Sequence, residues 1–581
     1  MTDLPCIDPD KIIPISHSTT EAFRTGTSSS RLPDHCEKVS ACRIACPAGN
    51  NITQALYQIA QGDFDGALST FLEENPLPGV CGNVCYHPCE PQCNRESWDG
   101  SVRIRALERA ASEFGDAQPH VLTEAGRNHP VAVIGSGPAG LSATYHLARM
   151  GHPVTLLEAE SELGGLLRWG IPLYRLPKEI LERDLARILS FNVWISTESP
   201  VDTSRFLELR KTHHAVFVAT GAQIGTSLNI PGIENGRVLL GLDFLKQVRR
   251  DALRDLMGKV VIIGGGNVAL DAALTAHRLG ADPVELACLE QRHEMPAHER
   301  EYQDAIEEGV VFHHGWGPRR ILDQDGRVTG VELIRCVKVF DQWGNFNPSF
   351  DESNVLKHDA DWVILAIGQK ADLSLLEGSG LLSEDSGDPL RVDENTMETS
   401  TMGVYAGGDF VGAPGTVVQA VATGKRAALS IHLSLMGKPF EKTMERALLG
   451  GGPAFSIESL FHPRTGWDPS AVVTFEDLEP LFLDHQPPAV LPRLDAAIRI
   501  RGFEQIEQSL ASDDAVREAG RCFFCGLCTG CDRCFIFCPD ICITPPQEGH
   551  INYHADPEYC KGCAVCASVC PRGVMTMGDK R

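Results

Sequence analysis

The sequence predicts a multidomain α/β protein in which two nested Rossmann-like domains lie between an N-terminal helical domain and a small C-terminal cysteine-rich domain. At 581 residues the chain is too long for one hydrophobic core. Two glycine-rich motifs, 135–140 and 264–269, each follow an apolar run and precede a helical pattern. Most of the 21 cysteines crowd into two stretches, 36–93 and 522–570. These observations put nucleotide folds in the middle and metal-type cysteines at both ends.

The composition is that of a globular protein with an acidic balance. Hydrophobic residues make up 43% of the chain, and the formal net charge is −25. This charge opposes binding to nucleic acid and to anionic membrane surfaces. No apolar run is long enough to span a bilayer, and the start, MTDLPCIDPD, lacks the basic and apolar regions of a secretory signal. We therefore expect a cytoplasmic location, no membrane span and no nucleic-acid partner.

The N-terminal segment carries seven closely spaced cysteines. Residues 1–35 are polar and rich in Ser and Thr, which predicts a poorly ordered arm, and 52–74 has an amphipathic helical pattern. Thiolates at such short spacings suit iron–sulfur clusters, with zinc as the alternative. Seven cysteines exceed one zinc site, and a redox-type fold follows, so iron–sulfur is favoured. The seven are Cys36, Cys42, Cys46, Cys81, Cys85, Cys89 and Cys93.

The first nucleotide motif stands in its full context. Residues 131–134 form an apolar, β-branched run, and Gly135, Gly137 and Gly140 follow as GxGxxG before a helical pattern. The glycines permit a tight turn, approach of the backbone to a pyrophosphate, and close packing of helix on strand. Glu158, about 20 residues on, is placed to bind a ribose diol. The alternative is an ordinary βαβ turn with glycines for packing, which the combined strand, helix and acid disfavour.

Later segments complete this fold and favour FAD as its cofactor. Asp409 ends a strand and is placed to accept hydrogen bonds from ribityl hydroxyls; its alternative is a solvated Asp in a Gly-rich turn. A helix beginning near Thr416 would stabilise negative charge on the reduced isoalloxazine. The positions expected to contact FAD are Gly135, Gly137, Pro138, Ala139, Gly140, Glu158, Gly164, Gly165, Leu166, Thr220, Gly221, Gly408, Asp409, Thr416 and Val417.

A second nucleotide fold is inserted between the two halves of the first. Residues 259–263 predict a strand, followed by Gly264, Gly266 and Ala269 as GxGxxA. A further strand over 283–289 ends at Glu290. The positions expected to contact this second dinucleotide are Gly264, Gly265, Gly266, Asn267, Val268, Glu290 and Gly368.

The C-terminal segment holds two runs of CxxCxxCxxxCP. In two-cluster ferredoxins the fourth cysteine of each run ligates the other cluster. One cluster is therefore expected on Cys528, Cys531, Cys534 and Cys570, and its partner on Cys560, Cys563, Cys566 and Cys538. Cys522, Cys525 and Cys542 are surplus, and packing or redox-inert thiols are the safer interpretation.

The residues CPAGNNI, NPLPGVCGNVCYHPCE and VRIRALERAA resemble the N-terminal domain of the glutamate synthase small-subunit family, which includes dihydropyrimidine dehydrogenase and electron-bifurcating transhydrogenases. The resemblance implies one or two [4Fe–4S] clusters here. One would use Cys46, Cys85, Cys89 and Glu108, whose alternative role is a solvated helix carboxylate. The other would use Cys42, Cys93 and Cys36, with Cys81 the nearest candidate for the fourth ligand.

The nested nucleotide folds resemble the flavin disulfide-reductase architecture, in which the first fold holds FAD and the second a nicotinamide dinucleotide. The family's NADP users carry two arginines where this chain has Leu289 and Glu290. A carboxylate favours a free ribose diol and repels a 2′-phosphate, so NAD(H) is predicted. Arg292 lies nearby and could soften the preference, or be a solvated charge.

These patterns divide the chain into six segments. They are an arm with a helical iron–sulfur domain (1–125), an FAD-binding domain in two halves (126–245 and 386–440), an NAD-binding domain (246–385), a connecting arm (441–515) and a two-cluster ferredoxin domain (516–581). The arm is Pro-rich and should track over a surface, with short helices at 475–483 and 503–510. It carries no catalytic constellation.

The last cysteine run also resembles the ferredoxin-like delta subunit of 2-oxoacid:ferredoxin oxidoreductases. The leading hypothesis is an NAD-linked diaphorase subunit of a larger complex, in which FAD converts two-electron hydride transfer into one-electron transfer to clusters. Expected partners are thiamine-diphosphate 2-oxoacid oxidoreductase subunits or ferredoxin-like proteins. Alternatives are a glutamate synthase small subunit, an NADH:ferredoxin or bifurcating oxidoreductase subunit, and a structural subunit whose clusters only stabilise it.

Overall fold

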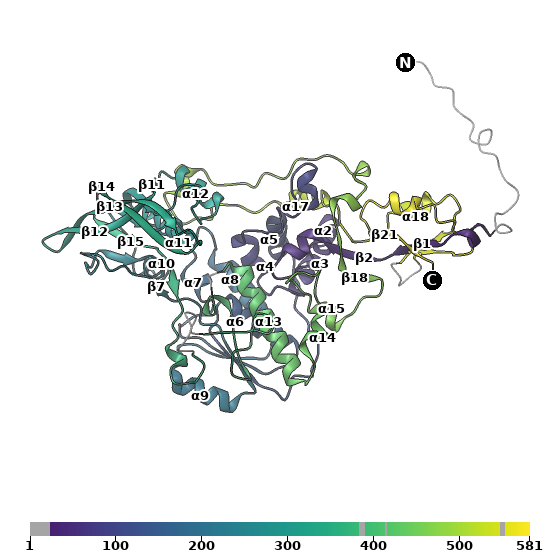
Figure 1. Cartoon of the computed structure of the whole chain (residues 1–581), viewed down its shortest axis with the longest axis horizontal. Coiled ribbons are helices and arrows are strands. Elements are labelled where there is room, and N and C mark those ends of the chain that lie inside the picture. The colour runs from purple at the N-terminus through teal and green to yellow at the C-terminus, as the bar shows by residue number, and fades with distance from the viewer. Residues whose placement is uncertain (1–23, 383–389, 413–414, 547–551, 581) are drawn as a thin grey trace, which may run out of the picture. The chain divides into compact units, whose positions relative to one another are not determined.

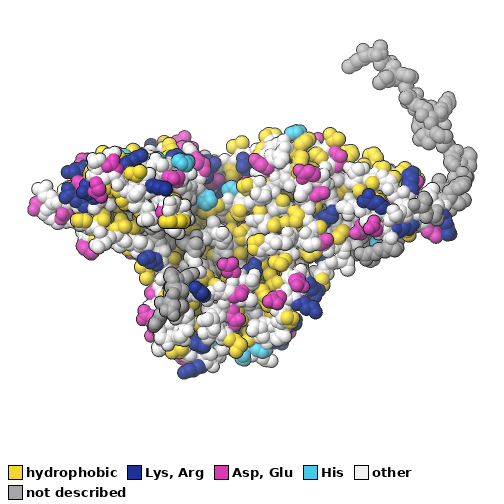
Figure 2. All heavy atoms as spheres, viewed as in Figure 1, with side chains coloured by type: hydrophobic (Ala, Val, Ile, Leu, Met, Phe, Trp, Pro, Cys, Tyr) yellow, Lys and Arg dark blue, Asp and Glu magenta, His cyan; other side chains and the backbone are white. Residues whose placement is uncertain are grey.

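The computed structural model describes residues 24–382, 390–412, 415–546 and 552–580. The chain divides into two compact units, which we treat separately. The smaller contains residues 1–40, 464–485 and 523–581, and the larger contains 41–463 and 486–522. No helix in the described part of the chain is both long and apolar enough to cross a membrane. On the face seen in Figure 2, acidic and basic side chains are interspersed, without one large field of either sign.

The smaller unit is built from short strands around the C-terminal cysteines. Its strands are β1 (Arg31–His35), β2 (Glu37–Ser40), β18 (Trp467–Val473), β19 (Ile543–Thr544), β20 (His554–Ala555) and β21 (Met575–Asp579), and its helices are α18 (Arg533–Ile536) and α19 (Val565–Ser568). β1 pairs antiparallel with β21, and β2 pairs parallel with β18. The end of the predicted disordered arm is therefore a strand, because pairing with distant strands satisfies its backbone.

The larger unit begins with a helical layer. Its helices are α1 (Ala41–Ala45), α2 (Ile52–Ala60), α3 (Phe64–Leu72), α4 (Pro78–Val84) and α5 (Ile104–Phe114), and α17 (Ser512–Gly520) packs on α2 and α5. The helical pattern predicted over 52–74 is two helices, because Gly62 has a φ of 79° and the Asp63 side chain caps α3 by accepting from the Gly66 N–H.

The first nucleotide fold contains a five-stranded parallel sheet, which agrees with the expected Rossmann-like domain. Its strand order is β17 (Val404–Ala406), β6 (Ala215–Val218), β3 (Val131–Ile134), β4 (Val154–Leu157) and β5 (Val193–Ser196). Helices α6 (Pro138–Arg149) and α13 (Val417–Leu435) pack against each other beside it (Figure 1). Helices α7 (Leu166–Trp169), α8 (Lys178–Ile188) and α9 (Thr203–Thr212) complete this part of the chain.

The second fold is also parallel, in the order β11 (Val311–His314), β10 (Ala281–Cys288), β9 (Gly258–Ile263), β15 (Trp362–Leu365) and β8 (Val238–Leu240). Its helices are α10 (Gly241–Arg249), α11 (Asn267–Arg278) and α12 (Glu299–Glu307). An antiparallel sheet of β12 (Trp316–Gln324), β13 (Arg327–Phe340) and β14 (Phe346–Asp359) is appended to it. β7 (Ile224–Gly225) and β16 (Gln369–Lys370) pair where the chain passes between the two folds.

The connecting segment differs from its prediction. It contains α14 (Phe440–Met444), α15 (Glu458–Phe461) and α16 (Ala496–Arg499), and 475–483 holds two 3₁₀ turns. Residues 503–510 are not helical. The Ile506 N–H donates to the Tyr174 carbonyl, and its own carbonyl accepts from Leu494. The Ile506 side chain is buried in the core of the second nucleotide fold. This tertiary pairing outweighs the local helical pattern.

Candidate flavin, nucleotide and iron–sulfur sites

One cleft of about 790 Å³ in the larger unit is lined by both nucleotide folds. Its size is in the range of cofactor pockets. From the first fold the predicted residues that line it are Gly135, Gly137, Pro138, Ala139, Glu158, Gly165, Leu166, Thr220, Gly221, Gly408, Asp409, Thr416 and Val417. From the second they are Gly266, Asn267, Val268 and Gly368. The other predicted contacts do not line the cleft: they are Gly140, Gly164, Gly264, Gly265 and Glu290, the last of which follows the end of β10 by two residues.

The first glycine loop leaves room for a ligand at one position only. A Cβ on Gly135 would lie 2.5 Å from the Ala219 carbonyl oxygen, and one on Gly140 would lie 1.9 Å from that of Gly135. A Cβ on Gly137 would meet nothing within 4 Å. The first and third glycines therefore permit internal packing, whereas the second borders open space at the N-terminus of α6, where a pyrophosphate would bind.

Glu158 is held at the end of β4 by the same loop. Its Oε2 accepts from the Ser136 N–H at 3.0 Å and from the Ser136 hydroxyl, and its Oε1 accepts from the Glu160 N–H at 2.9 Å. The side chain is buried but lines the cleft. An oriented carboxylate at this place can accept hydrogen bonds from a ribose diol.

Helix α13 presents its N-terminus to the cleft. Thr416 and Gln419 form a capping box, in which the Gln419 side chain accepts from the Thr416 N–H at 2.7 Å. Asp409 accepts from the Gly415 N–H at 2.9 Å, and burial raises the pKa of its carboxyl. Val417 lines the cleft at the first turn of the helix. The positive end of a 19-residue helix dipole is thus available to a bound ring system.

The second loop has Glu290 beside it. A Cβ on Gly265 would lie 2.8 Å from the Glu290 Oε2, and burial raises the pKa of this carboxyl. Arg292, the nearby cation, has its guanidinium 3.6 Å from the centre of the Tyr302 ring and pairs with Glu299. These contacts engage the Arg292 charge, and Glu290 is the carboxylate that lies beside the second glycine loop.

A network of hydrogen bonds joins Tyr86, which lies next to Cys85, to Asn267 of the second glycine-rich loop. The Tyr86 hydroxyl accepts from Asn267 at 2.8 Å and from Arg175 at 3.2 Å, and it lies 3.0 Å from a Glu301 carboxylate oxygen. The Tyr86 ring stacks on His298 with 3.3 Å between centroids. Tyr86 and Asn267 both line the cleft. Sequence reasoning missed this residue, because a single tyrosine between two cysteines carries no motif.

The N-terminal ligand set Cys46, Cys85, Cys89 and Glu108 surrounds one small cavity of about 20 Å³. Glu108 Oε1 accepts from Asn50 at 3.1 Å and from Asn75 at 2.9 Å. Burial raises the pKa of Glu108 to about 8 and that of Cys85 to about 12. Buried thiols without a counter-cation remain protonated, and a metal cluster supplies that positive charge. The residues present therefore fit a cluster, with the carboxylate oriented toward it.

This cavity adjoins helix α13. Val418 of α13 lines the cluster cavity, and its neighbour Val417 lines the large cleft. On the other side, Val84 and Tyr86 line the cleft while Cys85 between them lines the cavity. One helix turn and one loop thus separate the two sites.

The second N-terminal ligand set remains a prediction. Cys36 belongs to the smaller unit, and Cys42 and Cys93 belong to the larger one. Burial raises the pKa of Cys93, and the backbone groups of Val102 and Arg95 oppose part of that rise. Burial, together with the nearby Glu108, Cys85 and Cys46, raises the pKa of Cys81 well above the usual value. Cys81 is buried but is not among the residues that line the cavity of the first set.

The two C-terminal runs have matching backbones. Asp532 and Ala564, each directly after the second cysteine of its run, have φ values of 58° and 65° and start the short helices α18 and α19. Burial raises the pKa of Cys534 to about 12, with further contributions from Cys570, Cys528 and Cys531. These four are the set predicted for one cluster.

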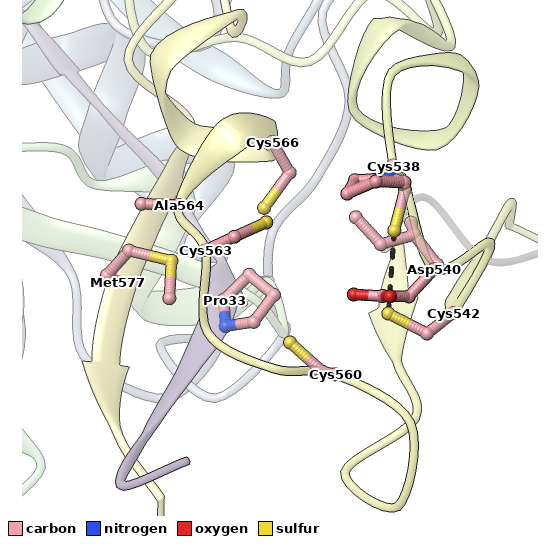
Figure 3. Close-up of a pocket in the computed structure, with 11 residues that line it drawn as sticks. Pro33, Cys538, Asp540, Cys542, Cys560, Cys563, Ala564, Cys566 and Met577 are labelled. Atoms are coloured by element: carbon pink, nitrogen blue, oxygen red, sulfur yellow. Dashed lines mark hydrogen bonds between the residues drawn. The ribbon is translucent and has the colours of Figure 1, made fainter. Parts of the chain in front are cut away.

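The four cysteines predicted for the partner cluster line one cavity of about 10 Å³ (Figure 3). They are Cys538, Cys560, Cys563 and Cys566. Cys542, interpreted from sequence as a surplus thiol, lines the same cavity, and its sulfur is 3.5 Å from that of Cys538. Its spacing matches no cysteine motif, so only the fold brings it there.

Comparisons with known proteins agree with this geometry. A family model described as pyridine nucleotide-disulphide oxidoreductase matches residues 129–424. A model described as "dihydropyrimidine dehydrogenase domain II, 4Fe-4S cluster" matches residues 16–119. A model described as "4Fe-4S binding domain" matches residues 553–576.

Three curated relatives are similar over about two thirds of the chain. The NADP(+)-dependent formate dehydrogenase subunit beta of Moorella thermoacetica is 36% identical over 70% of this chain and 61% of its own length. The NADPH-Fe(3+) oxidoreductase subunit beta of Geobacter sulfurreducens is 35% identical over 67% and 63%. The NAD-dependent dihydropyrimidine dehydrogenase subunit PreT of Escherichia coli is 34% identical over 68% and 91%. The chain thus spans less than two thirds of the first two relatives.

Proposed function

Since the chain belongs to the pyridine nucleotide-disulphide oxidoreductase family and carries 4Fe-4S domains on both sides of that fold, we propose that it is an NAD(H)-dependent electron-transfer subunit of a larger oxidoreductase. In this role it moves electrons between NAD and ferredoxin-type clusters through FAD. The family and its domains make the chain an FAD- and NAD(P)-dependent iron–sulfur oxidoreductase. The choice of NAD and the identity of the partners are the finer parts of the proposal.

The observation that carries the proposal is the continuity of the sites. Residues of both nucleotide folds line one cleft, and Val417 and Val418 connect this cleft to the cavity of Cys46, Cys85, Cys89 and Glu108. The chemistry that FAD supplies when bound is conversion between two-electron hydride transfer and one-electron transfer. A structural subunit would not need a nucleotide cleft that adjoins a cluster cavity.

The side chains of this chain have positioning roles. Glu158 would orient the adenosine ribose of FAD, and the N-terminus of α13 would supply a positive dipole to the bound ring system. Glu108 and the three cysteines would hold the cluster nearest the cleft, and Asn50 and Asn75 orient the Glu108 carboxylate. Tyr86 holds the loop of Cys85 against Asn267 at the start of α11.

The preference for NAD(H) rests on Glu290. Its carboxylate stands beside the glycine-rich loop, where the ribose of a bound dinucleotide would lie, and it would repel a 2′-phosphate. Two relatives are named for NADP or NADPH and one for NAD, so similarity alone leaves the choice open.

The partner we propose is a thiamine-diphosphate 2-oxoacid oxidoreductase, because the last cysteine run resembles its ferredoxin-like subunit. The setting we propose is the cytoplasm, where reducing conditions preserve thiolate ligands. Isolation of the native complex without oxygen identifies the partner. A thiamine-diphosphate subunit supports this assignment, whereas a formate dehydrogenase catalytic subunit or a glutaminase-containing subunit contradicts it.

Anaerobic reduction tests the core function. NADH added to the purified, iron-loaded chain should bleach the flavin absorbance near its visible maximum and then the broad cluster absorbance. NADPH should act more slowly at equal concentration. A chain that binds FAD and iron but shows no absorbance change with either nucleotide would contradict the electron-transfer role and favour a structural one.

A further inference from the structure

We propose that Glu285, His313 and His358 form a binding site for a divalent cation of the Zn²⁺ class, separate from the iron–sulfur and nucleotide sites. All three residues belong to the second nucleotide fold of the larger unit. Their ligand atoms lie within 4.8 Å of one another. The proposal does not depend on the function proposed above.

The three side chains come from three strands that converge. Glu285 lies on β10 and His313 on the adjacent β11, where His313 is in register with Ala287. Glu285 and Ala287 point to the same face of the sheet, so His313 and Glu285 are neighbours on that face. His358 lies near the end of β14 in the appended antiparallel sheet. A cation bound by all three would join the two sheets.

Both imidazoles point at one carboxylate oxygen. The distance from Glu285 Oε2 is 2.6 Å to His313 Nε2 and 2.7 Å to His358 Nδ1. The two rings are 4.2 Å apart between centroids, at 54° to each other. If both imidazoles are neutral, each donates its single N–H to the same carboxylate oxygen. His358 Nε2 is then buried and has no hydrogen-bond partner in the part of the chain that the structure describes.

A divalent cation would give these three ligand atoms a common partner. Two imidazole nitrogens and one carboxylate oxygen form a His₂Glu set, which binds Zn²⁺ at about 2.0–2.2 Å and leaves a fourth position for water. Such bonds place ligand atoms roughly 3.3 Å apart in a tetrahedron. The present distances must therefore widen by roughly 0.6–0.7 Å, which small rotations of the side chains provide.

Accessibility and charge permit entry of the ion. The side chains of Glu285, His313 and His358 are 18%, 20% and 14% exposed, so the site is lined by protein but open to water. Lys259 interacts electrostatically with Glu285, and its ammonium pairs with Asp359 at 2.8 Å. That pairing neutralises most of the repulsion which Lys259 would exert on a bound ion.

A second group of similar composition provides a matched control. His120, Glu458 and His462 also converge, but the two histidine side chains are 48% and 53% exposed. Arg149 already occupies Glu458 at 3.1 Å. An arginine on the carboxylate and the high exposure of the histidines disfavour a stable ion at this place.

The test uses the full chain, purified without oxygen with its iron and flavin. After treatment with a chelator and then equilibration with about 10 μM Zn²⁺, zinc, iron and flavin are counted per chain by elemental analysis and absorbance. The His313→Gln/His358→Gln variant should bind about one zinc ion fewer than the wild type, with unchanged iron and flavin. Glutamine can still donate a hydrogen bond to Glu285, which favours an intact fold.

The His120→Gln/His462→Gln variant should retain the wild-type zinc content. Zinc should also raise the unfolding temperature of the wild type and of this control, but not that of the His313/His358 variant. If the double variant loses flavin, Glu285→Gln replaces it. Equal zinc content in wild type and variants that retain flavin overturns the proposal and leaves a hydrogen-bonded histidine cluster. Equal loss in the control variant would also overturn it.

Discussion

Replacement of Lys425 should destabilise the packing of helix α13 against the N-terminal helical layer. Lys425 lies on α13 and Glu74 follows α3, and both side chains are fully buried with 2.6 Å between Nζ and Oε2. The ammonium also donates to the carbonyls of Ala48 and Phe455, each at 2.7 Å. All three of its N–H groups are therefore used, and burial lowers the pKa of Lys425 while Glu74 opposes that shift.

The expected cost of Lys425→Met is about 3–5 kcal/mol, because it leaves a buried carboxylate and two carbonyls without the cation. Glu74 would keep its contacts with Ser456 and the Ile457 N–H, but Arg43 is 4.0 Å away and compensates poorly. In the Glu74→Gln/Lys425→Met variant the uncompensated charge is removed, so part of the loss, about 1–3 kcal/mol, should be recovered.

The assay is urea unfolding of the iron- and flavin-loaded chain, followed by flavin fluorescence and far-UV circular dichroism. Lys442→Met, an exposed change on α14, is the matched control and should stay within about 0.5 kcal/mol of wild type. Because Ala48 follows Cys46 by two residues, Lys425→Met should also release iron more readily. The reasoning is refuted if Lys425→Met unfolds like Lys442→Met, or if the double variant is as unstable as the single one.

Three further perturbations test the sites. Glu290→Gln should lower kcat/KM for NADH by about 10- to 100-fold, because a charge-assisted hydrogen bond to the ribose is lost. The kcat/KM for NADPH should not fall in parallel. Glu108→Ala should remove up to about four iron atoms per chain and the corresponding paramagnetic signal, whereas the C-terminal clusters should keep theirs. Burial and then His152 lower the pKa of His432 from 6.5 to about 3, so its neutral form stabilises the fold above pH 6.5 and this stability is lost as the pH falls toward 3. Between pH 7.5 and 5.5 the wild type should lose about 1.4 kcal/mol more unfolding free energy than His432→Gln, and equal losses would contradict this assignment.

The local parts of the site could be predicted because their signals are local. The loop of Gly135, Gly137 and Gly140 needs particular residue types at fixed spacing, and so do the ferredoxin-type cysteine runs. The structure confirms the parallel strands around both glycine loops and brings most of the predicted contact residues to one cleft.

Predictions that depended on distant pairing were less successful. Residues 503–510 have a helical pattern, yet they pair with Tyr174 and Leu494 in an irregular conformation. The arm before Cys36 reads as polar and unstructured, yet 31–35 forms β1 against β21. In each case the observed hydrogen bonds join segments that are far apart in the chain. Local secondary-structure propensity is too weak to oppose such pairing.

The sequence by itself determined the nested nucleotide folds and the cysteine-rich 4Fe-4S segments at both ends, since glycine and cysteine chemistry depends on spacing within a few residues. Only the tertiary structure decided that Val417 and Val418 face different sites, that Lys425 and Glu74 meet in the interior, and that Cys542 joins a cluster cavity. Those contacts arise from packing between elements that are separate in sequence. No local pattern records such packing, because its free energy comes from burial that only the complete fold provides.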